Sequence, residues 1–270
     1  MTHEERRAAI EQPALQAGRN FESGLVERIL DAVEAEPGQL PLLEFALTEL
    51  WQRQTAQGVL THAAYETIGE VSGAIAKRAD ETLRRLPAAD QQRVRTIFTR
   101  LVRVAPPDEG SEDTKRRLLL DEIDPTLRPL VQALADARLV VTGRDEQQQS
   151  DTVEVAHEAL IRNWNALQTW LNSDREFLLW RQRLRGLVEN WTAARKDEGG
   201  LLRGATLSEA EGYLAARANE ISASEREFIE KSRQLAKQEA QAKEAATRLL
   251  RRRNQFLTVA LATALVALLI

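Results

Sequence analysis

Cysteine is absent from the 270-residue sequence, which excludes disulfide bonds, thiolate metal sites and a cysteine nucleophile. Histidine is scarce, with only His3, His62 and His157 present. The pair His157-Glu158 resembles the start of a zinc-protease helix, but that motif needs a second histidine four residues after the first. Position 161 is Ile161, so the sequence predicts no metal site.

The sequence also lacks a phosphate loop, because no lysine directly follows a glycine anywhere in the chain. Asp121 and Glu122 follow three leucines and imitate the acidic strand end of nucleotide hydrolases. Without a phosphate loop before them, we expect these two carboxylates to start a helix instead. Ser72 stands one residue out of register for a nucleophile elbow and is expected in a turn or helix. The sequence therefore predicts no complete catalytic machinery.

Helix breakers are unevenly distributed along the chain. No proline follows Pro129 and no glycine follows Gly212, so an uninterrupted helix is predicted from Tyr213 to Asn254. The net charge of −4 offers no basic excess for a nucleic acid, so nucleic acid is an improbable partner. The predicted fold class is mainly α.

The first region, residues 1–87, is predicted to be helical. Pro37-Gly38 interrupts the helical pattern, and a strongly apolar helix follows from Leu40 to Trp51 with Pro41 in its first turn. Thr61 precedes a further helix.

The second region, residues 88–156, combines helices with short strands. A helix from Asp90 to Val104, a short strand from Thr114 to Leu120 and a helix opened by Pro125 are predicted. Two β-rich runs, 139–141 and 153–155, then flank a polar stretch, which is typical of a hairpin. Helices followed by a small β-hairpin indicate a winged helix.

Residues 157–232 are predicted to form a Trp-rich helical domain, in which the tryptophans pack between helices. Residues 233–255 read as a charged helical stalk. Apolar residues recur every seven positions from Ile221 to Leu249, but their companions Ser224, Lys231 and Gln238 are polar, so a solvated stalk is favoured over a coiled coil.

The last residues, 256–270, contain no charge, amide, glycine or proline. A membrane span needs roughly 20 such residues, and three arginines, 251–253, precede the run on the side that stays cytoplasmic. We expect a truncated, single-pass transmembrane segment on the cytoplasmic side of the membrane. The alternative is a C-terminal helix docked on a core, which would show a polar face.

Three separated segments carry a resemblance to a known family: GQLPLLEFALTELW, VEVAHEALIRNWNALQTWL, and LLRGATLSEAEGYL with ASEREFIEKS. Together they resemble the bacterial novel STAND NTPases, the class usually followed by a transmembrane helix and WD repeats. The resemblance covers nearly the whole chain. It implies that residues 1–87 are a helical lid, that 88–156 are the winged helix, and that the whole protein is a switch controlled by ATP and ADP.

By this resemblance, Gly38 and Pro41 match the lid motif whose proline packs beside adenine, and His157 matches a histidine that contacts the β-phosphate of ADP. The P-loop ATPase module and the WD-repeat propeller of a full-length relative are the implied partners, together with the membrane and further copies in a homo-oligomer. Because the ATPase module is missing, we expect this chain to be non-enzymatic and to hold no cofactor alone.

Two other functions stay open at this point. A membrane-tethered winged-helix regulator would bind DNA through the helix that Pro125 opens. A helical adaptor would bind a protein partner through its Trp-rich helices.

Overall fold

The structure is a computed structural model that describes residues 2–34, 40–107, 110–146 and 149–269, with the backbone alone for 34, 40 and 256–269. The described chain is mainly helical with small sheets. It divides into two compact units, residues 1–179 and 180–270. The division falls within the predicted 157–232 region, so its first helices belong to unit 1.

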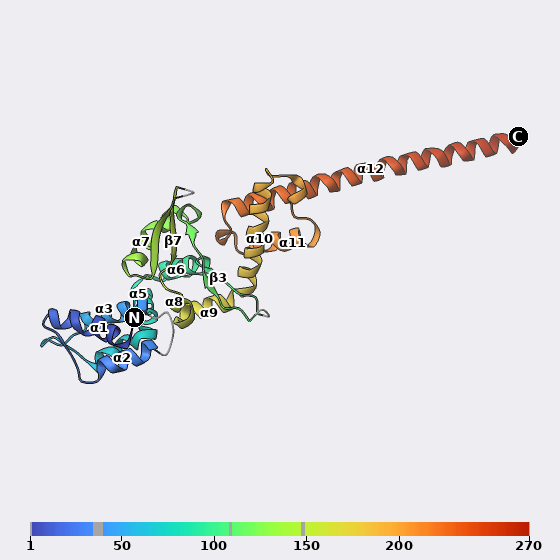
Figure 1. The fold of residues 1–270 in the computed structure, drawn as a ribbon. Coiled ribbons are helices and arrows are strands. Elements are labelled where there is room, and N and C mark those ends of the chain that lie inside the picture. The colour runs from blue at the N-terminus through green and yellow to red at the C-terminus, as the bar shows by residue number, and fades with distance from the viewer. Residues whose placement is uncertain (1, 35–39, 108–109, 147–148, 270) are drawn as a thin grey trace. The chain divides into compact units, whose positions relative to one another are not determined.

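Unit 1 begins with a group of helices, drawn in blue to cyan in Figure 1: α1 (His3–Gln16), α2 (Leu25–Glu34), α3 (Leu40–Gln52), α4 (His62–Ile68) and α5 (Glu70–Arg85). Two short parallel strands, β1 (Asn20–Phe21) and β2 (Val59–Leu60), pair the segment after α1 with the segment after α3. A helix follows Thr61 as predicted, and Thr61 caps it, since its hydroxyl oxygen accepts the N–H of Ala64 at 3.2 Å. Pro41 lies in the first turn of α3, also as predicted.

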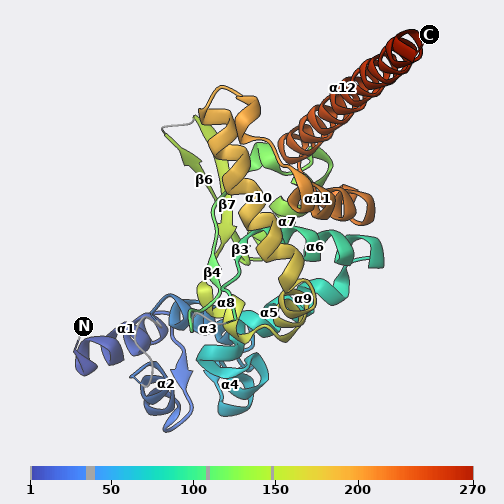
Figure 2. The ribbon, with the colours of Figure 1, turned by 90° about the vertical axis from the view of Figure 1, so that its right-hand side faces the viewer.

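The second part of unit 1 contains α6 (Ala88–Arg100), the antiparallel pair β3 (Val102–Arg103) and β4 (Thr114–Lys115), and a three-stranded sheet. The sheet is antiparallel in the order β5-β7-β6, from β5 (Leu118–Leu119), β6 (Val140–Asp145) and β7 (Ser150–Val155). The predicted hairpin is confirmed, with Val140 paired to Val155 and Asp145 to Ser150. Two 3-10 turns, η1 (Leu120–Glu122) and η2 (Pro125–Leu127), precede α7 (Arg128–Asp136), which lies beside the sheet in Figures 1 and 2.

Three helices follow the sheet: α8 (Glu158–Asn163), α9 (Asn165–Ser173) and α10 (Arg175–Ala193). Trp164, between α8 and α9, is only 1% exposed. Its ring meets the rings of Phe98 and Trp170 edge-on, each with a centroid separation of 5.1 Å. This tryptophan therefore joins α8 and α9 to the core of unit 1, as the sequence predicts for tryptophans that pack between helices.

Unit 2 contains the end of α10, the turn η3 (Glu198–Gly200), α11 (Gly204–Ala216), η4 (Ala218–Glu220) and α12 (Ala223–Leu269). The predicted uninterrupted helix from Tyr213 is wrong, because α11 ends at Ala216 and α12 starts after Ser222. The reason is a capping box: Glu225 accepts the N–H of Ser222 at 2.7 Å, and the Ser222 hydroxyl accepts the N–H of Glu225 at 3.3 Å. Each bond gives an acceptor to a backbone N–H group that would otherwise have none at the start of a helix.

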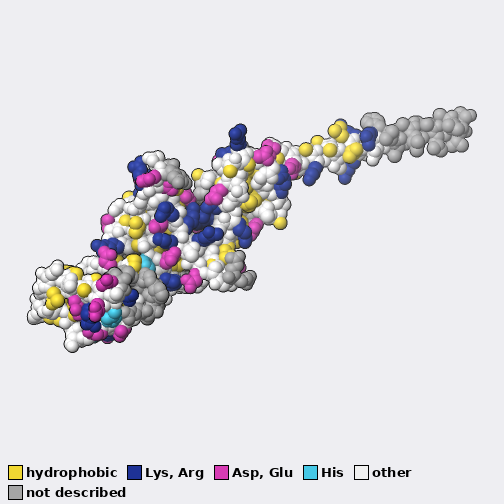
Figure 3. Space-filling model, in the orientation of Figure 1, with side chains coloured by type: hydrophobic (Ala, Val, Ile, Leu, Met, Phe, Trp, Pro, Cys, Tyr) yellow, Lys and Arg dark blue, Asp and Glu magenta, His cyan; other side chains and the backbone are white. Residues whose placement is uncertain are grey.

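One side of the first turns of α12 is buried, including Phe228, Ile229 and Ser232, whereas residues 239–255 are mostly exposed, with Leu249 at 67% and Leu250 at 52%. Figure 3 shows hydrophobic side chains next to basic ones along the exposed stretch of α12. No helix in the part of the chain that the structure describes is long and apolar enough to cross a membrane. The side chains of the predicted transmembrane segment 256–270 lie outside the described residues, so that prediction stays a prediction.

Candidate functional site

His157 lies where β7 ends and α8 begins, and it is half-buried. Its backbone is extended, with φ −147° and ψ 139°, and its Nδ1 accepts the N–H of Ala159 at 3.1 Å. An accepting Nδ1 carries no proton, so the neutral ring holds its proton on Nε2. The side chain thus caps α8 with one nitrogen and keeps the other as a hydrogen-bond donor.

The surroundings of His157 favour this neutral form. Burial lowers the pKa of the imidazole, and the positive charges of Arg162 and Lys115 lower that pKa further, while Glu158 opposes them. Both cations already have acidic partners, Glu112 for Arg162 at 3.4 Å and Glu154 for Lys115 at 3.3 Å. A neutral Nε2–H beside positive charge is suited to donate a hydrogen bond to an anionic oxygen, such as that of a phosphate.

Pro41 is exposed in the first turn of α3, while its neighbours Leu42 and Leu43 are buried at 2% and 6%. Pro41 is therefore accessible at the start of a helix whose next two residues are packed in the core. Gly38, the other lid residue singled out from the sequence, lies outside the described residues. Pro41 and His157 belong to separate elements, and both α3 and α8 pack on α5.

The residues that connect α8 to α5 were not predicted from the sequence. The indole Nε1–H of Trp164 donates to Oδ1 of Asp80 at 2.6 Å, and the Asn163 amide donates to the carbonyl of Ser72 at 2.8 Å. Asn163 and Trp164 stand within the segment that carries the family resemblance, which is the one available signal. Nothing in the sequence indicates that Asp80, 84 residues away, is the acceptor.

The other residues weighed for chemistry have structural roles. Ser72 lies in helix α5, as expected, and its hydroxyl is not set on a sharp turn. Asp121 and Glu122 lie in the three-residue 3-10 turn η1, and the α-helix that they were expected to start begins only at Arg128. Glu122 accepts from Arg116 at 3.0 Å and from the N–H of Leu119 at 3.3 Å.

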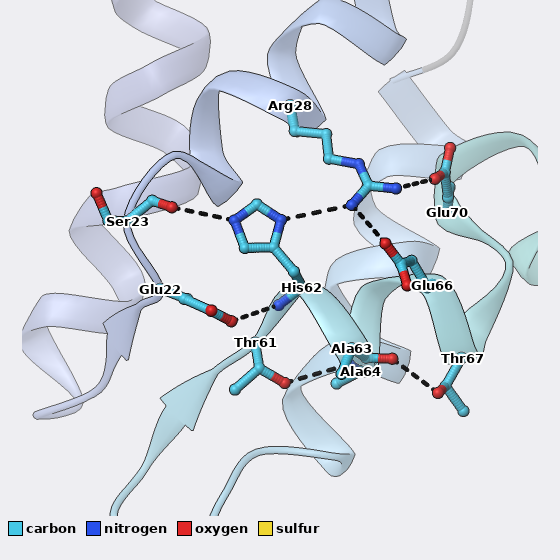
Figure 4. Close-up of polar contacts among 10 residues, drawn as sticks. All are labelled: Glu22, Ser23, Arg28, Thr61, His62, Ala63, Ala64, Glu66, Thr67 and Glu70. Carbon is cyan, nitrogen blue, oxygen red and sulfur yellow. Dashed lines mark hydrogen bonds and ion pairs between the residues drawn. The ribbon is translucent and has the colours of Figure 1, made fainter.

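His62 belongs to a polar cluster that joins α2 to α4 and α5 (Figure 4). Its Nε2 is 3.0 Å from the carbonyl oxygen of Ser23, and its Nδ1 is 3.5 Å from the Arg28 guanidinium. Arg28 also pairs with Glu66 at 2.9 Å and with Glu70 at 2.5 Å. Both ring nitrogens of His62 thus have partners, so this histidine has a structural role and helps to connect α4 to α2. In the described part of the chain, no group of three or more acidic or histidine side chains could hold a metal ion.

Comparison with known proteins agrees with the resemblance seen in the sequence. The model of the family described as Novel STAND NTPase 1 matches residues 1–199, which is more than half of the chain. No curated protein and no solved structure matches the chain. The matched range includes Pro41, the hairpin and His157. The chain therefore belongs to the Novel STAND NTPase 1 family.

Proposed function

We propose that this chain is the non-catalytic, nucleotide-sensing and signal-transmission segment of a membrane-anchored STAND-type signalling ATPase. The observation that carries the proposal is the state of His157: a neutral ring whose Nδ1 is held by the cap of α8 and whose Nε2–H is left as a donor. A phosphate oxygen of ADP, bound by a P-loop ATPase module, is the acceptor that this donor would meet. The exposed ring of Pro41 would pack beside the adenine.

The arrangement of α6, α7 and the sheet supports the same proposal. A helix, a short strand, a second helix and a hairpin, with the sheet in the order β5-β7-β6, form the pattern that we interpret as a winged helix. His157 lies two residues after the end of β7, the last strand of its hairpin. A nucleotide that contacts His157 would therefore favour the state in which lid and winged helix close over it, and its loss would favour the open state.

The exposed face of α7 gives no support to DNA binding as the alternative. Arg128 is the cation on this face of α7, and it pairs with Asp121 at 2.9 Å. Gln132 donates to Asp136 at 2.9 Å on the same face. A recognition helix needs cations that can replace the counterions of DNA phosphates, and this one presents a neutralised arginine beside a carboxylate.

Calorimetric titration with ADP tests the proposal, using the chain alone and the chain joined to a P-loop ATPase module of the family. We expect binding only to the joined protein, because the chain alone offers one donor and one apolar ring. Micromolar binding of ADP to the chain alone would contradict the need for the module.

The variant His157→Ser sharpens this experiment, because serine keeps an oxygen that can cap α8 but removes the Nε2 donor. A hydrogen bond to a charged group contributes about 1.5–3 kcal/mol, so the affinity of the joined protein for ADP should fall roughly 10- to 100-fold. His3→Ser, in α1, is the matched control and should leave the affinity unchanged. An unchanged affinity in His157→Ser would show that His157 does not contact the nucleotide.

A further inference from the structure

The short helix α8 is attached to α5 at the end opposite His157. Asn163 is the last residue of α8 and Trp164 follows it, whereas His157 caps the first turn. The residues that supply the two acceptors, Ser72 and Asp80, are separated by about 12 Å along the axis of α5, since a helix rises 1.5 Å per residue. Two bonds at separated points on one helix fix a direction as well as a position.

The apolar contacts of Trp164 reinforce these bonds. Its ring is 1% exposed and lies edge-on against Phe98 of α6 and Trp170 of α9. Within such packing the indole N–H has one direction in which to donate, and Asp80 stands there at 2.6 Å. Because the acceptor is a carboxylate, the bond is stronger than one between neutral groups.

We infer that Trp164 and Asn163 are positioning residues, which place the His157 ring relative to the lid helix α5 through their bonds to Asp80 and Ser72. This inference rests on the proposed function, in which His157 contacts the nucleotide and therefore has to be held in place. Neither Trp164 nor Asn163 would touch the nucleotide. Both would act through α8, which is six residues long and too short to bend independently at its two ends.

Ser72 and Asp80 are exposed residues, and the bond from Asn163 to the Ser72 carbonyl lies at the exposed edge of the contact. The bond from Trp164 to Asp80 is part-buried, and its donor belongs to a ring that is only 1% exposed. If α8 moved away while this ring stayed buried, the indole N–H would be left without a partner, which is costly. The contact therefore holds α8 in one place on α5.

Nuclear magnetic resonance can test this placement on the full chain without nucleotide. The chain has only three histidines, so the ring protons of His157 can be assigned by comparison with His3→Ala and His62→Ala. The midpoint of their titration reports the burial of the ring, which lowers the pKa of His157. We expect Trp164→Phe and Asp80→Ala to move this midpoint up towards the ordinary histidine value of roughly 6.5. Hydrogen exchange at Ala159, whose N–H donates to His157, should become faster in the same variants.

Two matched variants separate positioning from general loss of packing. Asp80→Asn keeps a carbonyl oxygen for the indole and should behave like the unaltered chain. Trp170→Phe reduces a ring in the same aromatic cluster without touching the bond to Asp80, and should leave the titration midpoint of His157 in place. An unshifted midpoint in Asp80→Ala would overturn the inference, as would an equal shift in Trp170→Phe. Asp80 is exposed, so its variants are expected to fold even where Trp164→Phe does not.

This outcome is independent of the ADP titration. A shifted midpoint with no effect of His157→Ser on ADP binding would keep the positioning role and refute the nucleotide contact. The opposite pair of results would keep the contact and refute the role of Trp164.

Discussion

Two hydrogen-bonded contacts in this chain, one in each unit, differ in their exposure to water. In unit 1, the Asn163 amide of α8 donates to the Ser72 carbonyl of α5, and both residues are exposed. In unit 2, α12 is joined to the segment before α11 by Ser232, which is 0% exposed. The Ser232 hydroxyl donates to the Phe228 carbonyl at 2.8 Å and accepts the N–H of Leu202 at 3.0 Å.

The difference lies in what breaking each contact would leave behind. At the exposed edge, water replaces the lost partner of an acceptor. Around Ser232 no water reaches the N–H of Leu202, so a broken bond leaves a buried donor without a partner. The exposed bond in unit 1 thus costs little to break, whereas breaking the buried bond in unit 2 is costly.

Removal of the buried hydroxyl should have the largest effect. Ser232→Ala leaves the N–H of Leu202 without an acceptor in a dry site, which costs about 1–3 kcal/mol of the free energy of unfolding. Urea unfolding followed by circular dichroism measures the loss. Ser208→Ala is the control, because that exposed hydroxyl only donates to Gly204 of its own helix, and it should change the free energy by less than about 0.5 kcal/mol. Equal effects of the two substitutions would remove the distinction between buried and exposed bonds.

Loss of the cap on α8 should come next. His157→Ala removes the acceptor of the Ala159 N–H at a half-buried helix start, and the loss of such a cap typically costs about 1 kcal/mol. The same unfolding measurement applies, with His157→Asn as the control, since asparagine is a good capping residue. If alanine and asparagine destabilise the chain equally, the Nδ1 bond does not stabilise α8.

The exposed bond of Asn163 should have a smaller effect than either. Asn163→Ala removes a side chain that donates to the Ser72 carbonyl, but the carbonyl then bonds to water. The expected loss is about 0.5 kcal/mol, the low end of the range for a hydrogen bond. A loss as large as that of Ser232→Ala would show that this exposed bond stabilises the chain as much as the buried bond in unit 2.

Particular residues show how far the sequence alone could predict this molecule. The helix after Thr61, the position of Pro41 in the first turn of α3 and the hairpin were predicted from local patterns, and all three are present. The start of α12 could also have been predicted, because Ser222 and Glu225 have the spacing of a capping box. The absence of glycine and proline instead led to the prediction of one continuous helix. The pairing of Asp80 with Trp164 was out of reach, since it joins residues 84 positions apart and depends on how α5 and α8 pack. Local spacing predicts elements, whereas contacts between elements depend on tertiary structure.

The last prediction concerns acidity and has the smallest expected effect. Burial, with help from Arg162 and Lys115, lowers the pKa of His157 in the folded chain, while the unfolded chain keeps the ordinary value. Between these two values the unfolded state binds more protons than the folded state, so stability falls as the pH falls. The contribution of His157 is fully present above roughly pH 6.5 and is lost as the pH falls through its folded-state pKa. Urea unfolding at pH 8 and at pH 5.5 should therefore show a decrease that is smaller in His157→Asn, because asparagine keeps the cap but does not titrate. An identical decrease in both proteins would mean that groups other than His157 cause it. The pKa of His157 would then not be lowered in the folded chain.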